Sequence, residues 1–360
     1  MDKKKNRKYY DVGILSYNLY TSNNYGAVLH SYAFQQYLDK VGVSNVIVDY
    51  RPPQRRFKWL FEKGLAFMIR SLKFKLFFRK HYRKTKKTYN YNNIIDIDYI
   101  NRYVCETDVT WSYNKKYGFD RGFFCDFKNM KYNDNVAYSV DFGSNLFTPE
   151  AEEEFKHLTK NFKYIAIRNN FKLDYVKKLT GRDDIEIAVD PVFLLEKEDY
   201  RKIMKIPRIK KGYVLVYNCV ENNSSLLKAA KRFAKENNLK VIELSLFKDN
   251  NIIRKKVLTA SIEDFLGYIY GAEYVFTNSY HGICFSVLFN KQFYAFARKG
   301  NSEKIQSVLE TFGLQDRLYD KELGINTAKI DYDKVIPEIE RVVKDSKEFI
   351  KKSLVDNRPQ

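Results

Sequence analysis

The sequence predicts an α/β protein made of two doubly wound domains, each a parallel sheet covered by helices, which face one another across a cleft. Short apolar runs alternate with segments of helical periodicity along most of the chain, as in parallel sheets with covering helices. The alternation restarts beyond residues 190–195, after Pro191 ends a strand. The chain of 360 residues is also long enough for two domains of ordinary size.

The chain opens with a predicted strand, helix and strand. Residues 12–16 are apolar, apolar positions recur at helical spacing over residues 27–40, and residues 44–50 form the second strand. The loop after the first strand ends at residues 24–26, Asn-Tyr-Gly. Backbone N–H groups at such a junction can bind an anion, although a simple helix start explains the pattern equally well.

Residues 51–90 carry most of the excess positive charge of the chain. Fourteen Lys or Arg residues stand here against one acidic residue, Glu62, and they alternate with many Phe and Leu residues. The pattern is typical of a core helix with a solvated basic face, or of a helix that lies on an anionic membrane surface. The sequence leaves both interpretations open. We do not expect nucleic-acid binding, because no recognised binding module accompanies the charge.

The rest of the first domain alternates again, apart from residues 91–131, which are rich in tyrosine and show no clear pattern. Strands are predicted at residues 135–141, 164–168 and 185–190, and helices at 149–161 and 173–179. Arg168 stands at the carboxyl end of its strand. There the cation can point into the crevice of the sheet, or it can pair with a nearby carboxylate.

The second half repeats the pattern. Strands are predicted at residues 212–218, 239–245, 274–277 and 291–297, and helices at 224–237, 261–270, 283–289 and 303–312. We therefore predict an N-terminal domain at 1–190, with the basic segment as an insertion, a C-terminal domain at 191–332, and a final helix within 333–360 that packs back on the first domain. This is the GT-B architecture.

The most distinctive stretch is residues 272–282, AEYVFTNSYHG, in which a strand runs into a polar loop and then a buried helix. His281, one of four histidines, lies in this loop. Loops at the carboxyl ends of parallel strands, facing a helix N-terminus, bind anions and substrates. The alternative is a histidine that only satisfies local backbone groups. A second candidate anion site is the loop 298–302, RKGNS, which also precedes a helix.

Charge and cysteine content limit the partners and the compartment. The net charge of +20 favours anionic partners. The four cysteines show neither CxxC pairs nor metal-ligand spacing, so we predict reduced thiols. Residues 2–10 lack the apolar core of a secretory signal, and no uncharged run is long enough to cross a bilayer. We expect a cytoplasmic protein, with attachment to the inner face of the membrane as an open alternative.

Several stretches together resemble the polysaccharide pyruvyl transferase family. The matching stretches follow the family's order and spacing and lie at residues 23–38, 164–170, 186–195, 261–293 and 297–318. The most specific of them are TNSYHG, followed by an apolar helix, and RKGNS. The resemblance departs at residues 101–128, where the family's glycine-serine-aspartate element ahead of a tryptophan is missing before Trp111.

The resemblance implies transfer of a pyruvyl group from phosphoenolpyruvate to a sugar of a cell-surface polysaccharide or its lipid-linked precursor. The product is a pyruvate ketal, and no metal or organic cofactor is expected. His281 is the expected general acid, or the cation that stabilises the leaving phosphate. Residues expected to bind phosphoenolpyruvate are Arg168, Ser279, Gly282, Arg298, Lys299 and Asn301. Residues expected to face the acceptor are Asn23, Asn24 and Tyr25.

Two other functions remain open from the sequence. One is a nucleotide-sugar glycosyltransferase of the same architecture. The other is a catalytically degenerate family member that acts in capsule assembly. Four polar residues are predicted to be structural or solvated, namely Asp190 at the domain boundary and the histidines His30, His81 and His157.

Overall fold

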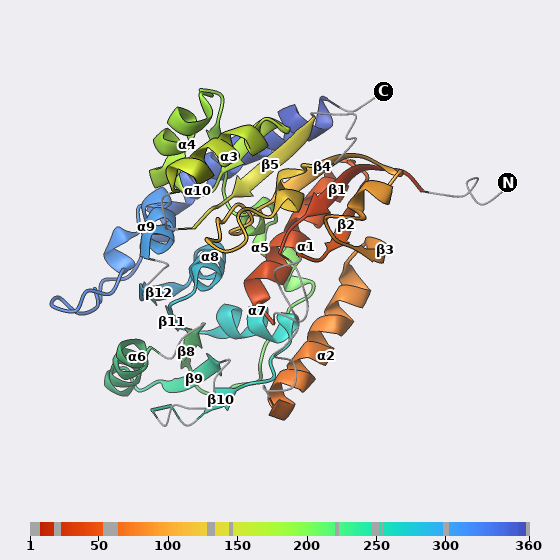
Figure 1. The fold of residues 1–360 in the computed structure, drawn as a ribbon. Coiled ribbons are helices and arrows are strands. Elements are labelled where there is room, and N and C mark those ends of the chain that lie inside the picture. The colour runs from red at the N-terminus through yellow and green to blue at the C-terminus, as the bar shows by residue number, and fades with distance from the viewer. Residues whose placement is uncertain are drawn as a thin grey trace.

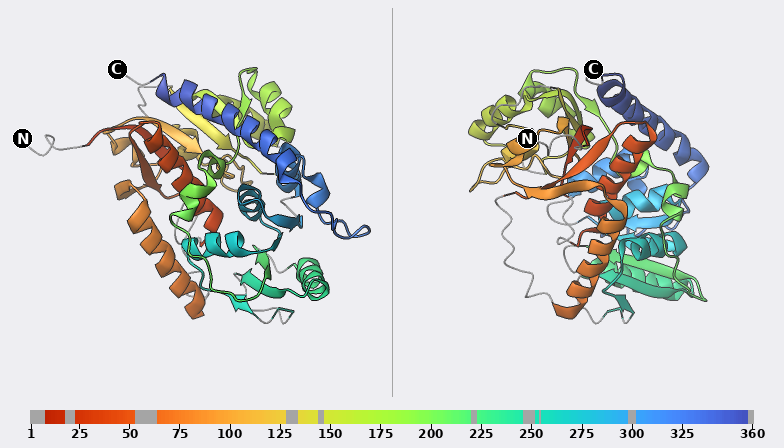
Figure 2. Two further views of the ribbon diagram at one scale, coloured as in Figure 1. Left: turned by 180° about the vertical axis from the view of Figure 1, so that it is seen from behind. Right: turned by 90° about the vertical axis from the view of Figure 1, so that its right-hand side faces the viewer.

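The computed structural model describes most of the chain. The described residues are 8–17, 23–52, 64–127, 134–143, 147–219, 223–245, 252–253, 255–297 and 302–357. Figure 1 shows two sheets, one above the other, each with helices packed against it, and Figure 2 shows the same arrangement from two further sides. The predicted fold class is confirmed.

The first sheet has seven parallel strands in the order β3-β2-β1-β4-β5-β6-β7. They are β1 (Tyr10–Leu15), β2 (Asn45–Tyr50), β3 (Lys84–Tyr89), β4 (Ile100–Glu106), β5 (Asn135–Val140), β6 (Phe162–Ile167) and β7 (Glu186–Ile187). The connecting helices are α1 (Tyr25–Lys40), α2 (Gly64–His81), α3 (Pro149–Thr159) and α4 (Leu173–Thr180). The strand order reverses between β1 and β4, and ligands bind beside such a reversal in open α/β sheets.

The second sheet has five parallel strands in the order β10-β9-β8-β11-β12. They are β8 (Tyr213–Asn218), β9 (Lys240–Ser245), β10 (Lys256–Val257), β11 (Tyr274–Thr277) and β12 (Gln292–Ala295). Its helices are α6 (Ser224–Glu236), α7 (Ile262–Gly271), α8 (Tyr280–Leu288) and α9 (Ser302–Thr311), and the short α5 (Lys197–Arg201) precedes it. The order of this sheet reverses between β8 and β11.

Three strands were not predicted from the sequence, namely β3, β4 and the two-residue edge strand β10. β4 lies within residues 91–131, where no element was predicted, and it is a central strand of the first sheet. β3 lies within the basic segment, where we expected only a helix, and it is an edge strand with several exposed lysines. Lysines on an edge strand prevent pairing with other chains, which explains a polar strand at this position.

The two sheets share one buried apolar cluster, which runs from Val104 on β4 through Val28 on α1 to Leu215 on β8. The ring of Tyr25 stacks on Phe265 of α7, with 4.6 Å between the ring centroids. Helix α1 therefore holds the two sheets together, and loops from both sheets meet at its N-terminus.

The final helix α10 (Tyr332–Ile350) returns to the first sheet, as predicted (Figure 1). Phe349 packs against Tyr138 of β5, and the guanidinium of Arg102 on β4 donates hydrogen bonds to the carbonyls of Ser353 and Leu354. Within the described residues, no helix combines the length and the apolar character needed to cross a bilayer.

Candidate active site

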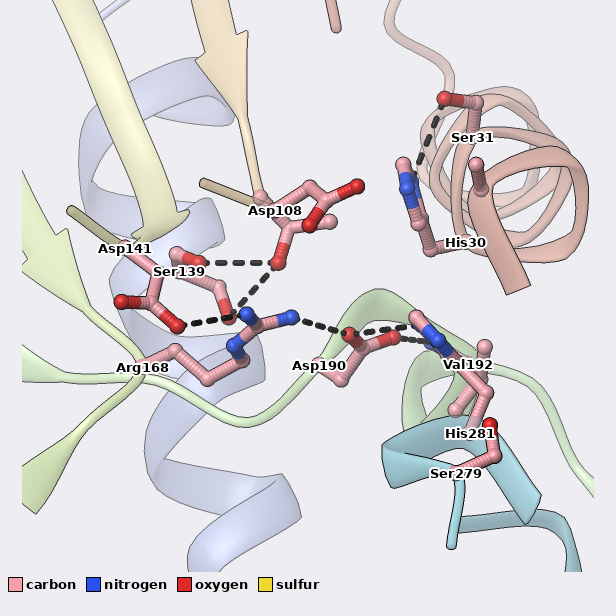
Figure 3. Close-up of polar contacts among 12 residues, drawn as sticks. His30, Ser31, Asp108, Ser139, Asp141, Arg168, Asp190, Val192, Ser279 and His281 are labelled. Carbon is pink, nitrogen blue, oxygen red and sulfur yellow. Dashed lines mark hydrogen bonds and ion pairs between the residues drawn. The ribbon is translucent and has the colours of Figure 1, made fainter. Parts of the chain in front are cut away.

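Side chains from both sheets converge beside the two strand-order reversals (Figure 3). His281 follows β11 in the second sheet, whereas Asp108 follows β4 and Arg168 follows β6 in the first. Asp190 joins them from the connection between the sheets, and His30 joins them from α1. The site is therefore assembled from segments that lie far apart in the sequence.

Arg168 lies in the centre of this cluster. Its Nη2 is 2.6 Å from Asp141 Oδ2, and its Nη1 is 3.2 Å from Asp190 Oδ2. The guanidinium also lies 4.4 Å from the centroid of the Tyr280 ring, which is a cation–π contact. All three charged side chains are buried, with at most 3% of each exposed.

The ion pairs shift the pKa values of Arg168, Asp141 and Asp190. Burial disfavours the charge on Arg168, but Asp141, Tyr280 and Asp190 outweigh it and hold the pKa of Arg168 well above its usual range. The pKa of Asp141 lies below its usual value because Arg168 and Lys304 outweigh the burial of the carboxylate. The pKa of Asp190 is lowered against burial by His281, His30 and Arg168. Arg168 thus lies where the sequence predicted it, but both of its Nη groups are already paired.

His281 contacts the same oxygen of Asp190. Its Nε2 is 3.2 Å from Asp190 Oδ2, close enough for an ion pair, but it is not aligned with any hydrogen-bond acceptor among the described residues. Burial lowers the pKa of His281, and the charges of His30 and Arg168 add to this, while Asp190 opposes it. The imidazole is therefore mostly neutral near pH 7, with an Nε2 that can engage a ligand.

His30, which we predicted to be structural or solvated, is fully buried within the cluster. Its Nδ1 is 2.8 Å from Glu106 Oε1, and its ring lies 5.7 Å from the ring of His281. Ser31 donates a hydrogen bond of 3.0 Å to the other oxygen of Glu106. Burial disfavours the charged imidazole, but the Glu106 carboxylate outweighs it and raises the pKa of His30. The pKa values of the neighbouring His30 and His281 are thus shifted in opposite directions.

Asp190 is more than the structural residue that we predicted. Its Oδ1 does accept from the backbone N–H of Val192 and so caps the turn at Pro191–Leu194, as a structural residue would. Its Oδ2, however, contacts both Arg168 and His281. The sequence did not reveal this second role, because both partners lie far away along the chain.

Asp108 was missed together with the strand that precedes it. Thr107, Asp108 and Ser139 all have positive φ, at 26°, 62° and 54°, and the Thr107 hydroxyl donates to the Ser139 carbonyl. Such conformations cost of order 1–3 kcal/mol each and cluster at functional sites. The pKa of Asp108 is lowered to about 2, because Lys304, Arg168, His30 and His281 outweigh burial. An aspartate directly after a central strand is the signal that could have revealed it.

A cavity of about 380 Å³ opens beside the cluster. Asp141, Arg168, Asp190, Tyr280 and Lys304 belong to its lining, together with residues of α9 and α10. Lys304 was not among the predicted site residues, although it lies just beyond the RKGNS loop. The lining holds three cations and five carboxylates, and His281 is not part of it; the charged residues are Arg168, Lys304, Arg341, Asp141, Asp190, Glu310, Glu338 and Asp345.

Ser279 and Gly282, which we predicted to bind phosphoenolpyruvate, make contacts within the first turn of α8. Ser279 is its N-cap, and its Oγ accepts the backbone N–H of Gly282 at 3.3 Å. This N–H is therefore satisfied within the chain, in contrast to the predicted anion contact. A side chain on Gly282 would overlap the hydroxyl of Thr277, so the glycine is needed for packing.

The predicted acceptor residues lie at the start of α1. The Asn24 side chain accepts from the Ala27 N–H and caps the helix, and Asn23 donates to the Ser71 hydroxyl at 2.8 Å. The Tyr25 hydroxyl donates to the carbonyl of Ala260 in the second domain. These are structural contacts, and a role toward an acceptor stays a prediction for all three residues. The predicted phosphoenolpyruvate ligands Arg298, Lys299 and Asn301 lie outside the described residues.

Gly26 makes room for His281, since a Cβ at this position would overlap the imidazole. If His281 has the catalytic role that the family resemblance implies, Gly26→Ala should push the ring aside and lower turnover by roughly 100-fold, because misplacing a reacting group by 1 Å can cost that much. The measurement is the rate of phosphate release from phosphoenolpyruvate with an acceptor present, together with the NMR signal of the His281 ring.

The matched control is Gly181→Ala. Gly181 has φ +68° and open space around it, so the substitution should cost roughly 1–2 kcal/mol of stability without affecting turnover. Wild-type turnover in Gly26→Ala would contradict a role for the position of the imidazole.

Among the described residues, no group of three or more His, Cys, Asp or Glu side chains is arranged to hold a metal ion. A family model described as polysaccharide pyruvyl transferase matches residues 24–300. No curated protein matches the sequence.

Two solved structures illustrate the likeness of the fold. UDP-N-acetylglucosamine 2-epimerase from Rickettsia bellii is 13% identical, with 98% of this chain and 97% of that one covered and a TM-score of 0.51. UDP-GlcNAc 2-epimerase from Methanocaldococcus jannaschii is 12% identical, with 92% of each chain covered and a TM-score of 0.47. At 13% identity the likeness to the Rickettsia bellii enzyme concerns the fold alone, and the fold is GT-B.

Proposed function

Since the chain belongs to the polysaccharide pyruvyl transferase family, we propose that it transfers a pyruvyl group from phosphoenolpyruvate to a saccharide and forms a pyruvate ketal. The acceptor is a sugar of a cell-surface polysaccharide or of its lipid-linked precursor. One observation carries the assignment of the site: His281 and Arg168 converge on the same oxygen of Asp190, beside a cavity that Lys304 also lines.

The reaction needs one proton donor. Protonation of the methylene carbon of phosphoenolpyruvate leaves an oxocarbenium-like centre at the neighbouring carbon, and a sugar hydroxyl attacks this centre. The bond from this carbon to the phosphate oxygen then breaks, and a second hydroxyl closes the ketal. Of the two hydroxyl protons released, one replaces the proton given to the methylene carbon and the other leaves with the phosphate.

His281 is the proposed donor. Its pKa is lowered in the free protein, so it must gain a proton when the substrate binds. The phosphate of phosphoenolpyruvate brings close to two negative charges, and an anion beside an imidazole raises its pKa. The Asp190 carboxylate, 3.2 Å from Nε2, supports this role because it favours the protonated imidazole.

The negative charge of phosphoenolpyruvate requires fixed cations. Lys304 lines the cavity, and the sequence places Arg298 and Lys299 just before it in the chain. We propose that these three residues bind the phosphate and carboxylate. For Arg168 we propose a role other than the predicted binding of phosphoenolpyruvate, since both of its Nη groups are paired with carboxylates. It holds Asp190 in place against His281 and is a positioning residue.

The test is incubation of the full chain with phosphoenolpyruvate and a panel of acceptors, namely free disaccharides, nucleotide sugars and lipid-linked saccharides. Mass spectrometry should find one acceptor that has gained the mass of pyruvic acid less one water, with one phosphate released for each transfer. A chain that consumes nucleotide sugar and ignores phosphoenolpyruvate would instead be a glycosyltransferase. Absence of both reactions would favour the degenerate, non-catalytic reading.

A further inference from the structure

Helix α2 has two apolar faces, and only one of them packs against the rest of the protein. Phe67, Phe74, Phe77 and Phe78 are buried against the rest of the protein. The opposite face carries five exposed apolar side chains, with exposed fractions of 70%, 63%, 39%, 59% and 54% for Leu65, Met68, Ile69, Leu72 and Leu76. Their spacing of three, four, seven and eleven residues from Leu65 places them in one row along the helix.

This apolar row lies at the edge of the molecule. Helix α2, drawn in orange, has other elements on one side only in Figure 1 and in the left view of Figure 2. An apolar row of this size on a surface marks an interaction site.

Basic side chains flank the apolar row. At 100° per residue, Lys75 lies on one side of the row, Lys80 lies on the other, and Arg79 extends it at the last turn. All three are exposed, as are Lys86 and Lys87 of the adjoining strand β3. No Asp or Glu occurs anywhere in residues 64–90. The surface therefore combines an apolar centre with a rim of one charge sign.

The helix is held firmly in this orientation. Arg70 donates to the carbonyl of Leu258 at 3.0 Å, and Lys73 donates to the carbonyl of Thr259 at 2.8 Å, both in the second domain. These two cations point inward and tie α2 across the domain junction. The exposed row is thus a fixed surface of the folded protein.

We propose that this face of α2 docks on an anionic lipid bilayer. The apolar row would enter the boundary between headgroups and acyl chains, and Lys75, Arg79 and Lys80 would meet the lipid phosphates. The charge pattern favours lipid over a second copy of the chain, because two copies would bring two basic rims together. This docking does not depend on the enzymatic activity.

A consequence for the acceptor follows, and it rests on the proposed function. Ser71 of α2 accepts the hydrogen bond from Asn23, in the loop that leads to α1 and that the sequence predicts to face the acceptor. Docking through α2 would hold this loop close to the bilayer. A lipid-linked saccharide is the acceptor class that this placement favours.

The test is co-sedimentation of the full chain with vesicles of phosphatidylcholine alone or with about one third phosphatidylglycerol. We expect binding only to the anionic vesicles. Leu72→Glu combined with Leu76→Glu should lower the partition coefficient at least 100-fold, because charged groups would have to enter the apolar boundary. The matched control is Leu323→Glu, at a leucine that is 90% exposed elsewhere on the protein.

A second pair of variants separates local from overall charge. Lys75→Glu, Arg79→Glu and Lys80→Glu together should lower the partition coefficient at least 100-fold, since each basic residue near an anionic surface contributes to binding. The same three reversals at the exposed Lys228, Lys231 and Lys235 of α6 change the net charge equally and should have little effect. Circular dichroism checks that each variant is folded.

Three results would overturn the proposal. They are equal binding to neutral and anionic vesicles, an equal loss of binding in the α6 variant, and a wild-type chain that dimerises through the Leu72 and Leu76 face without binding vesicles. Because sedimentation needs no turnover, a failure here leaves the proposed reaction untouched. Vesicle binding by a chain that does not consume phosphoenolpyruvate would reject only the reaction.

Discussion

His281→Ala is expected to reduce the turnover of phosphoenolpyruvate by about 10²–10⁴-fold, which is the usual contribution of a positioned acid or base. The imidazole contacts Asp190 and lies beside His30, and its Nε2 makes no aligned hydrogen bond within the described residues. Its loss removes the proposed proton donor and opens a small space between the domains. The measurement is steady-state phosphate release with an acceptor identified by mass spectrometry.

His157→Ala is the matched control, because His157 is an exposed histidine on α3 in the same protein. It should keep wild-type turnover. Thermal unfolding of both variants separates loss of chemistry from loss of fold. If His281→Ala retained more than a tenth of the wild-type rate, the assignment of the proton donor would have to be withdrawn.

The pH dependence of kcat/KM and kcat is an independent test of the role of His281. The pKa of His281 lies below the ordinary 6.5 and that of His30 lies above it. An acid that acts in its protonated form gains activity as pH falls, so kcat/KM should rise from pH 8 toward pH 5. Bound phosphate raises the pKa of His281, which shifts the kcat profile to higher pH than the kcat/KM profile. NMR titration of the two imidazoles, with and without inorganic phosphate, measures these shifts directly.

Arg168→Met is expected to destabilise the protein by about 3–5 kcal/mol, the usual cost of removing one partner of a buried ion pair. The substitution leaves the carboxylates of Asp141 and Asp190 buried without their shared cation. An arginine that only binds substrate would instead weaken the use of phosphoenolpyruvate at unchanged stability. The measurement is the free energy of unfolding from urea titration at neutral pH.

Lowering the pH should reduce the difference in the free energy of unfolding between Arg168→Met and wild type. This direction follows from the pKa values of Asp141 and Asp190. Their pKa values lie below the ordinary value in the folded protein, so the stability they contribute is present above the unfolded-state pKa and is lost as pH falls through the folded-state values. Without Arg168 this contribution is missing at neutral pH. The free energies of unfolding of variant and wild type should therefore converge as pH falls.

The control for Arg168 is Arg201→Met, which breaks an exposed pair with Glu198 on α5. Exposed ion pairs add little to stability, so this variant should unfold close to wild type. Equal stability of Arg168→Met and wild type, together with a raised requirement for phosphoenolpyruvate, would restore the role predicted from the sequence.

Local sequence signals predicted several features correctly. The helix predicted at residues 261–270 is confirmed as α7. A capping box fixes its start, since Ser261 accepts the Asp264 N–H and Asp264 accepts the Ser261 N–H. The strand before His281 lies where periodicity predicted it, but the helix begins at Tyr280 rather than at residue 283. His281 therefore lies in the first turn of α8 and not in the loop that we predicted. In each case the signal comes from residues within a few positions of one another.

Local sequence signals did not predict strand β4. It is buried, yet it contains Arg102 and Glu106, which are unusual in a core strand. Arg102 bonds to carbonyls at Ser353 and Leu354, and Glu106 pairs with His30. These partners make the burial possible, and all of them lie far along the chain. A central strand therefore looked irregular.

By itself, then, the sequence determined the α/β class, the family, the strand–loop–helix around His281 and the placement of Arg168 at the end of a strand. Only the tertiary structure decided the electrostatics of the site: that Asp141 and Asp190 neutralise Arg168, and that His30, paired with Glu106, lies beside His281. The reason is that Coulomb interactions depend on distance in space and on burial. Local patterns encode neither quantity for groups that only the folded chain brings together.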